Sequence, residues 1–237
     1  MHGTMQMVAQ RSVNTGKHSV IPSLARTAPR DALDLLEQFG TTITAERDRE
    51  ILGQGDRAEF CYKILSGCVR RVKLMEDGRR QVGEFLLAGD LFGFDVLDTH
   101  DFAAEAVSDV VLRRYPLRMV EALAESQLAL ARRLRDLTAA SLRVAHGRLV
   151  LLGRKTASER IASFLLEMAE RLPERGKGAV DLPMSRTDMA DHLGLTIETV
   201  CRVLAHLRRD GTIAIERGAV EIRDRVGLQQ MASEPRH

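Results

Sequence analysis

The 237-residue chain lacks several features that would place it in well-known classes. It has no run of eighteen apolar residues, which argues against a membrane-spanning helix. It has no secretory signal pattern, so we expect a cytoplasmic protein. Its three cysteines, Cys61, Cys68 and Cys201, fit neither a disulfide framework nor the paired spacing of a zinc site. We therefore expect no metal and no other cofactor.

Net charge is also small. The chain has 35 Lys and Arg against 33 Asp and Glu, a formal charge of +2, so charge alone does not argue for a nucleic-acid partner. An argument for DNA binding must come from local arrangement. With 44% hydrophobic and 29% charged residues, the composition is that of a soluble globular protein, and the length favours two domains.

The N-terminal half divides into two parts. Residues 1–30 are polar and aperiodic, and we interpret them as a flexible arm. Residues 31–117 contain short alternating runs separated by glycine, among them EFCYKILSGCVRRVKL and FAAEAVSDVVLRRYP. Asp77-Gly78 indicates a hairpin turn. Short, evenly spaced strands of this kind predict an antiparallel barrel or roll.

After Pro116 the hydrophobic period becomes helical, and we predict one long helix over residues 118–152. Within this helix, mainly apolar residues recur at alternating spacings of four and three, the pattern of a coiled-coil seam. A helix of this length leaving a β domain favours pairing with a second copy. The alternative is a helix that packs on its own barrel. The predicted seam contains Leu130, Leu134, Leu137, Ser141, Val144 and Leu151, with Arg148 interrupting it.

Residues 153–237 predict a winged helix-turn-helix. A first amphipathic helix is expected to begin at Ser158 as N-cap. Ala190 is small where two later helices would cross, and Gly194 suits the turn between them. Val200 and Val203 fall on the buried side of the second of these helices. The run TIAIERGAVEIRD that follows predicts a terminal hairpin, the wing.

The second helix of this motif has a distinctive exposed face. With Thr196 as N-cap, the apolar positions of the helix turn one compact group of side chains outward. In a recognition helix, arginine can donate two bonds to guanine and glutamate can accept one from cytosine. Ser185 and Arg186, at the start of the first helix, are candidate contacts to the DNA backbone. The predicted outward group is Ile197, Glu198, Cys201 and Arg202.

These motifs resemble the Crp/Fnr transcription regulators, and more narrowly their FixK-like branch. The resemblance covers GDLFG in the roll, the long helix, ASERIASFLLEMAERL, and LPMSRTDMADHLGLTIETVCRVLAHLRRDG. It implies an α+β homodimer: an N-terminal double-stranded β-roll like a cyclic-nucleotide-binding jelly roll, a dimerisation helix, and a C-terminal winged helix-turn-helix. It also implies transcription activation with RNA polymerase as partner. The implied target is double-stranded DNA, a palindrome with TTG and CAA at its outer ends.

One position departs from the family pattern. In the Fnr-like branch the recognition helix has Glu, Ser and Arg where this chain has Glu198, Cys201 and Arg202. Cysteine keeps the size of serine, weakens the hydrogen bond and adds redox chemistry. Two interpretations of Cys201 stay open, a redox switch and a passive substitute for serine.

The residues by which members of this family sense a signal are missing from this chain. Members that bind a cyclic nucleotide have adjacent Arg and Ser where this chain has Asp101 and Phe102, so a cyclic phosphate would meet no hydrogen-bond donor there. Residues 1–60 contain no cysteine for an iron-sulfur cluster. We therefore expect DNA binding without an effector. Two alternatives remain, a ligand-gated or haem-type member with His100 as the candidate ligand, and a thiol enzyme.

The enzyme alternative needs a base near Cys201. His206 is about 140° away around the helix, so it cannot reach the thiol. His192, on the preceding helix, is the other candidate. We predict that the protein is not an enzyme.

Overall fold

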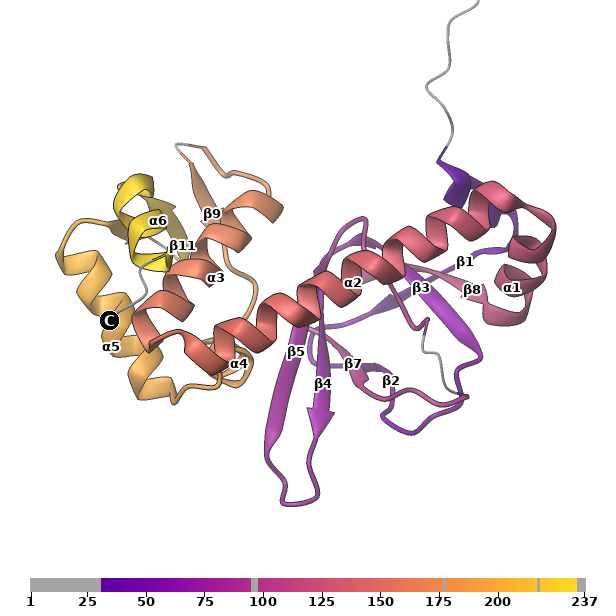
Figure 1. Ribbon diagram of the computed structural model, residues 1–237, viewed down its shortest axis with the longest axis horizontal. Coiled ribbons are helices and arrows are strands. Elements are labelled where there is room, and N and C mark those ends of the chain that lie inside the picture. Colours follow the sequence, from indigo (N-terminus) through magenta and orange to yellow (C-terminus); the bar gives the residue numbers. More distant parts are fainter. Residues whose placement is uncertain (1–30, 95–97, 177, 217, 234–237) are drawn as a thin grey trace, which may run out of the picture. The chain divides into compact units, whose positions relative to one another are not determined.

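The computed structural model describes residues 31–94, 98–176, 178–216 and 218–233, so the arm predicted over 1–30 lies outside it. An antiparallel roll follows, as the sequence predicts (Figure 1). Its first sheet has the order β1 (Thr41–Ala45), β8 (Val110–Pro116), β3 (Phe60–Ser66) and β6 (Leu91–Phe92). Its second has the order β2 (Glu50–Leu52), β7 (Ala103–Ala106), β4 (Cys68–Leu74) and β5 (Arg80–Leu87).

The two sheets of the roll enclose an apolar core. Val69 and Leu112, on β4 and β8, have no exposed surface and belong to one cluster. The hairpin expected at Asp77-Gly78 joins β4 to β5, and Gly78 has φ +82°, which glycine adopts without strain. The sequence did not indicate the first two elements of the roll, the 3-10 helix η1 (Ala32–Phe39) and strand β1, and the TTITA run of β1 is polar and largely exposed.

The predicted long helix is interrupted. α1 (Leu117–Ser126) ends before Gln127, whose backbone is extended, and α2 (Leu128–Arg154) begins after it. α2 also continues past Gly153, where we expected it to end. Figure 1 shows α2 passing beside the roll and ending where α3 (Ala157–Arg171) begins. Thr156, not Ser158, caps α3, because the Thr156 hydroxyl and Glu159 form a reciprocal capping box.

The C-terminal part contains the predicted winged motif. After β9 (Ala179–Asp181) come α4 (Arg186–Leu193) and α5 (Ile197–Arg209), and then the wing, β10 (Ile213–Glu216) paired with β11 (Ala219–Ile222). The sequence did not indicate α6 (Arg225–Ser233), which packs on α3. No helix in the described ranges is long and apolar enough to cross a membrane.

Candidate nucleic-acid interface

The helix-turn-helix forms as its sequence pattern predicts. Gly194 closes α4 in the left-handed conformation, φ 61° and ψ 44°, and its N–H donates to the carbonyl of Ala190. Ala190 is buried between the helices, and Val200 and Val203 lie on the buried face of α5. Leu207 extends that face by one turn. The predicted small residue, turn glycine and apolar positions are therefore where the motif needs them.

The outward face of α5 is also as expected. Thr196 is the N-cap, and its Oγ1 accepts a hydrogen bond from Thr199 N at 3.2 Å. This fixes the first turn, so the buried valines face inward and the intervening residues face solvent. The exposed group is Ile197, Glu198, Cys201 and Arg202.

Glu198 and Arg202 are four residues apart on α5, but they do not form an ion pair. Arg202 Nη2 donates instead to Thr199 Oγ1 at 3.3 Å, and the described ion pairs contain none between the two residues. The backbone N–H of Glu198 and the Thr196 side chain hold the pKa of the Glu198 carboxyl below its usual range. The carboxylate is therefore charged and available at the N-terminus of the helix.

The start of α4 is closed by a capping box. The Ser185 hydroxyl accepts from Asp188 N at 3.0 Å and donates to Asp188 Oδ2 at 2.7 Å, so it is engaged in a capping box. Arg186 is half-exposed, and its Nη1 lies 3.2 Å from Met189 Sδ. Of the two predicted backbone contacts, Arg186 offers the freer donor group.

Arg160, on α3, is a supporting residue that sequence reasoning missed. Its guanidinium donates to Leu193 O at 2.8 Å, at the end of α4. It also donates to Leu152 O at 2.8 Å and to Lys155 O at 2.9 Å, at the end of α2. One cation thus neutralises the negative ends of two helices and holds the turn of the motif against α2. An arginine inside an amphipathic helix gives no sign of such a role.

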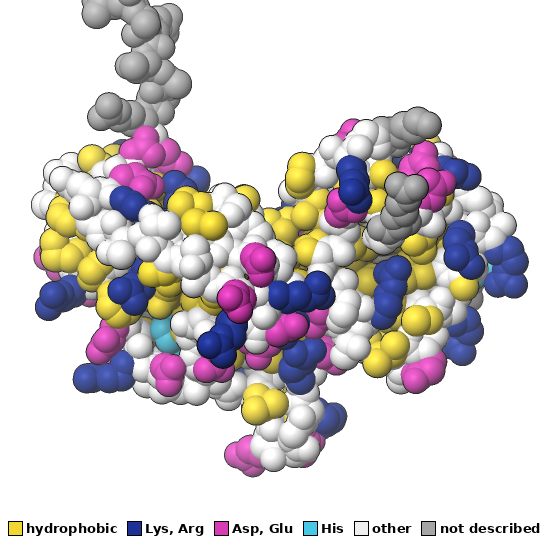
Figure 2. Space-filling view, turned by 180° about the vertical axis from the view of Figure 1, so that it is seen from behind, with side chains coloured by type: hydrophobic (Ala, Val, Ile, Leu, Met, Phe, Trp, Pro, Cys, Tyr) yellow, Lys and Arg dark blue, Asp and Glu magenta, His cyan; other side chains and the backbone are white. Residues whose placement is uncertain are grey.

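The surface around α5 is basic. Arg208 and Arg209 are exposed near the end of α5, in addition to Arg202. Figure 2 shows Lys and Arg side chains along the right-hand edge of that view, on the C-terminal part of the chain. The small net charge of the chain therefore conceals a local excess of cations that can approach phosphates.

The predicted dimer seam does not form one exposed line. Leu130 has no exposed surface and lies in a core cluster with Leu33 and Leu36 of η1, so a second copy cannot bury it further. Leu134 and Leu137 are half-buried against the same cluster. That part of the helix packs on its own roll, which was the alternative reading of the sequence.

The remaining predicted seam residues differ among themselves. Leu151 packs against the core of the C-terminal part, whereas Ser141 and Val144 are exposed and line a pocket. Arg148 contacts both ring nitrogens of buried His192. A different line of α2 is apolar and exposed: Leu128, Leu142 and Leu149, at 63%, 56% and 70%. These three recur in register with a seven-residue repeat.

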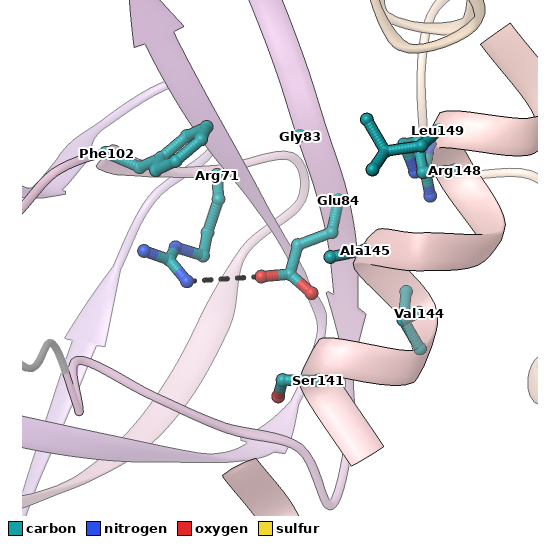
Figure 3. A pocket seen from close by; sticks show the side chains of 9 residues that line it. All are labelled: Arg71, Gly83, Glu84, Phe102, Ser141, Val144, Ala145, Arg148 and Leu149. Atoms are coloured by element: carbon teal, nitrogen blue, oxygen red, sulfur yellow. Dashed lines mark hydrogen bonds and ion pairs between the residues drawn. The ribbon is translucent and has the colours of Figure 1, made fainter. Parts of the chain in front are cut away.

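The pocket between the roll and α2 has a volume of about 330 Å³ (Figure 3). Across it Arg71 Nη1 donates to Glu84 Oε1 at 3.3 Å, and the Arg71 guanidinium lies 5.0 Å from the Phe102 ring. Asp101, next to that ring, accepts from Lys73 Nζ at 2.8 Å. The cations near the place of a cyclic phosphate are thus paired with carboxylates of the chain.

The three thiols differ in access. Cys61 and Cys68 are buried in β3 and β4, and burial raises the pKa of both to about 12. Cys201 is exposed on α5. His192 is buried on α4, and His206 Nδ1 lies 2.9 Å from Asp210 Oδ2. Among the residues that the structure describes, His192 and His206 thus have their contacts with Val82, Arg148 and Asp210, and neither is hydrogen-bonded to Cys201.

Known proteins match both halves of the chain. A model for the Crp-like helix-turn-helix domain matches residues 159–231, and one for the cyclic nucleotide-binding domain matches residues 42–127. The nitrogen fixation regulation protein FixK of Azorhizobium caulinodans is 45% identical over 82% of this chain and 80% of its own length. The transcriptional activator protein FnrL of Cereibacter sphaeroides is 34% identical over 78% and 77%.

A solved structure agrees with these sequence relatives. FixK2 from Bradyrhizobium japonicum superposes with a TM-score of 0.79 at 41% identity, over 82% of this chain and 98% of that one.

Proposed function

The chain belongs to the Crp/Fnr family of transcription regulators, and from that premise we propose that it is a homodimeric activator of the FixK type. It reads a TTG...CAA palindrome and needs no small-molecule effector. Its site of action is the cytoplasm, where it recruits RNA polymerase. The observation that carries the proposal is the exposure of Glu198, Cys201 and Arg202 in the N-terminal half of α5, whose inner face is apolar.

The chemistry of that group suits base reading. Arg202 can donate two parallel bonds to guanine O6 and N7, while the charged Glu198 accepts from cytosine N4. Both lie within the first turns of α5, the part of a recognition helix that enters the major groove. Arg186 at the start of α4 supplies a backbone contact that sets register without reading sequence.

Dimerisation is supported by the exposed line of α2. Leu128, Leu142 and Leu149 would be buried by the same three residues of a second copy, with Ala131 and Ala145 between them allowing close approach. This line replaces the seam that sequence spacing suggested, because Leu130 and its neighbours already have partners in their own chain. A two-fold axis along α2 matches the two-fold symmetry of a palindrome.

Effector independence is supported by the pocket of Figure 3. Glu84 is an internal partner of Arg71, so a ligand phosphate would have to displace a carboxylate that is already in place. The alternative is a ligand-gated member in which a different small molecule occupies the 330 Å³ pocket. Calorimetry with purified protein, with and without cell extract, distinguishes the two.

Redox control through Cys201 is a second candidate, favoured by the exposure of that thiol next to Arg202. Oxidation to an acid would place negative charge against phosphates and base edges. In the alternative, Cys201 only substitutes for serine.

One experiment tests the proposal as a whole. Purified protein without added ligand is used to select bound duplexes from a random pool, in reduced and in peroxide-treated form. Enrichment of a palindrome with TTG and CAA ends by the reduced protein is the expected result. Enrichment of no sequence would contradict the proposed activity. Equal enrichment by the oxidised protein would leave that activity standing and contradict redox control.

A further inference from the structure

A buried ionic cluster joins the roll to the helix-turn-helix. At its centre is Asp188 of α4, whose side chain is 3% exposed. Its Oδ1 accepts from Arg70 Nη1 and from Arg80 Nη2, both at 3.0 Å. Arg70 and Arg80 come from β4 and β5, more than 100 residues earlier in the chain. A single carboxylate oxygen therefore holds two guanidinium groups of the other domain.

The other oxygen of Asp188 has a separate task. Oδ2 accepts from Ser185 N at 3.0 Å and from Ser185 Oγ at 2.7 Å, which closes the capping box of α4. The same side chain thus caps the first turn of α4 and attaches the helix to the roll. Because α5 packs on α4, what fixes α4 also fixes the recognition helix.

The two arginines are themselves held in place. Arg70 Nε donates to Glu105 Oε2 at 2.7 Å, and its Nη2 donates to Asp48 Oδ1 at 3.3 Å. Arg80 Nε donates to Asp191 Oδ2 at 2.9 Å, one turn further along α4. The planar fork of each guanidinium is used in several directions, which lysine could not reproduce.

Apolar contact alone could hold these two surfaces together. Replacing a buried ion cluster by apolar groups is often neutral or stabilising, so ionic groups in such a place are better explained by orientation than by strength. Hydrogen-bonded guanidinium groups accept only a narrow range of positions for their acceptors. The cluster therefore restricts how α4 can lie on β4 and β5.

We propose that Arg70, Arg80 and Asp188 are positioning residues that lock the helix-turn-helix to the roll in the arrangement needed to read both half-sites. The proposal rests on the dimeric operator reading proposed above. In a dimer joined through α2, the orientation of each α4 on its roll sets the separation of the two recognition helices. Half-sites one helical turn apart tolerate little error in that separation. This lock takes the place of an effector-driven rearrangement.

The test compares two duplexes, an operator with both half-sites and a duplex with one. The double substitution Arg70→Gln, Arg80→Gln keeps Asp188 and its capping box but removes the two guanidinium groups that bind Asp188. Operator affinity should fall about tenfold or more, while single half-site affinity stays within about twofold. Equal loss on both duplexes would mean that the substitutions damage the DNA-binding motif itself, and no loss on either would mean that the cluster has no positioning role. Both results contradict the proposal.

Two further variants show whether a loss of affinity comes from the cluster or from a general loss of structure. Arg80→Gln alone is milder, because this side chain is 28% exposed, and should show a smaller loss of the same kind. Arg79→Gln is the matched control, since Arg79 is 76% exposed and bonds to Asp77 on the hairpin. It should bind both duplexes like the wild type.

A measurement without DNA separates this proposal from the one it rests on. Spin labels at the exposed Cys201 and at Glu76→Cys report the distance between α5 and the β4–β5 hairpin, in labelled protein diluted with unlabelled chains. The distribution should be narrow in the parent and broad in the double variant. An unchanged distribution contradicts the lock whatever the DNA results are. If the wild type binds neither duplex but the distance distribution is still broader in the double variant, the result contradicts only the proposed function.

Discussion

The helix-turn-helix has two faces with opposite treatment of polar groups. On the inner face Asp188 and His192 are buried, Asp188 is bonded to the roll, and His192 contacts both the roll and Arg148 of α2. On the outer face Glu198 and Arg202 are exposed and interact with residues of the same first turn, Thr196 and Thr199. Polar groups with long-range partners hold a motif in place, whereas exposed ones can exchange local bonds for those of a ligand.

Disrupting the proposed dimer, which brings two outer faces to one operator, should have the largest effect on DNA binding. Leu142→Glu places a charge at the centre of the exposed line of α2, where a dimer would bury one from each chain. We expect a monomer by analytical ultracentrifugation and a loss of operator affinity of about 100-fold or more, since both half-sites contribute.

Val144→Glu is the control for that experiment. Val144 is about 200° away from Leu142 around α2 and belongs to the seam that sequence spacing suggested. This variant should remain a dimer. A monomeric Val144→Glu together with a dimeric Leu142→Glu would restore the original seam.

On the outer face itself, Arg202→Ala should cost about 1 to 3 kcal/mol on the operator and flatten discrimination at one base pair per half-site. A panel of duplexes with single base changes measures this. Unchanged base preference would refute the role of Arg202.

Arg186→Ala provides the contrast on α4. It should weaken binding to all sequences alike and lower the slope of log affinity against log salt by about one unit, as expected for a phosphate contact. Competition titrations at several salt concentrations test it. A change in base preference would mean that Arg186 reads sequence.

The inner face can be tested through pH. Burial, and then the charge of Arg148, lower the pKa of His192 to about 3, and its Nδ1 lies 3.2 Å from Val82 O. In the unfolded chain this residue binds a proton below about pH 6.5, whereas in the folded chain it stays neutral until about pH 3. Its ionisation therefore does not lower the free energy of unfolding above pH 6.5, and lowers it progressively as the pH falls from 6.5 towards 3. The expected slope is about 1.4 kcal/mol per pH unit from this one residue.

Urea unfolding at a series of pH values, applied to His192→Gln, measures that slope. Gln can still donate to Val82 O and accept from Arg148, and removal of the titrating group should flatten the curve between pH 6.5 and 5. His206→Gln, on the exposed side of α5, serves as control. If both variants keep the wild-type slope, another group is responsible for it.

The smallest effect is expected at Cys201. Cys201→Ser should bind the operator within about twofold of the reduced wild type, because the two side chains are similar in size. If the thiol is a switch, peroxide abolishes wild-type binding but not that of the variant, and a Cys61→Ser, Cys68→Ser double variant stays sensitive because those thiols are buried. Equal loss in Cys201→Ser and wild type would falsify redox control.

Sequence patterns predicted the roll, the wing and the outward group of α5, because each depends on local periodicity and turn chemistry. They failed where a residue's partner is distant in the chain. Leu130 has the spacing of a dimer seam, yet η1 covers it. Asp188 was readable as a cap for α4, but nothing in the sequence joins it to Arg70 and Arg80. Spacing identifies the apolar residues of a helix and leaves open which neighbour buries them.

The exposed line of α2 has a consequence for the cell. Arg135 occupies the heptad position between Leu128 and Leu142 and bonds to Asp136, so the line is interrupted by a solvated charge. Such an interruption weakens a coiled coil. We therefore expect monomer and dimer to coexist at low abundance. The concentration of DNA-competent dimer then rises with the square of the total protein, and a twofold change in synthesis gives up to a fourfold change in promoter occupancy.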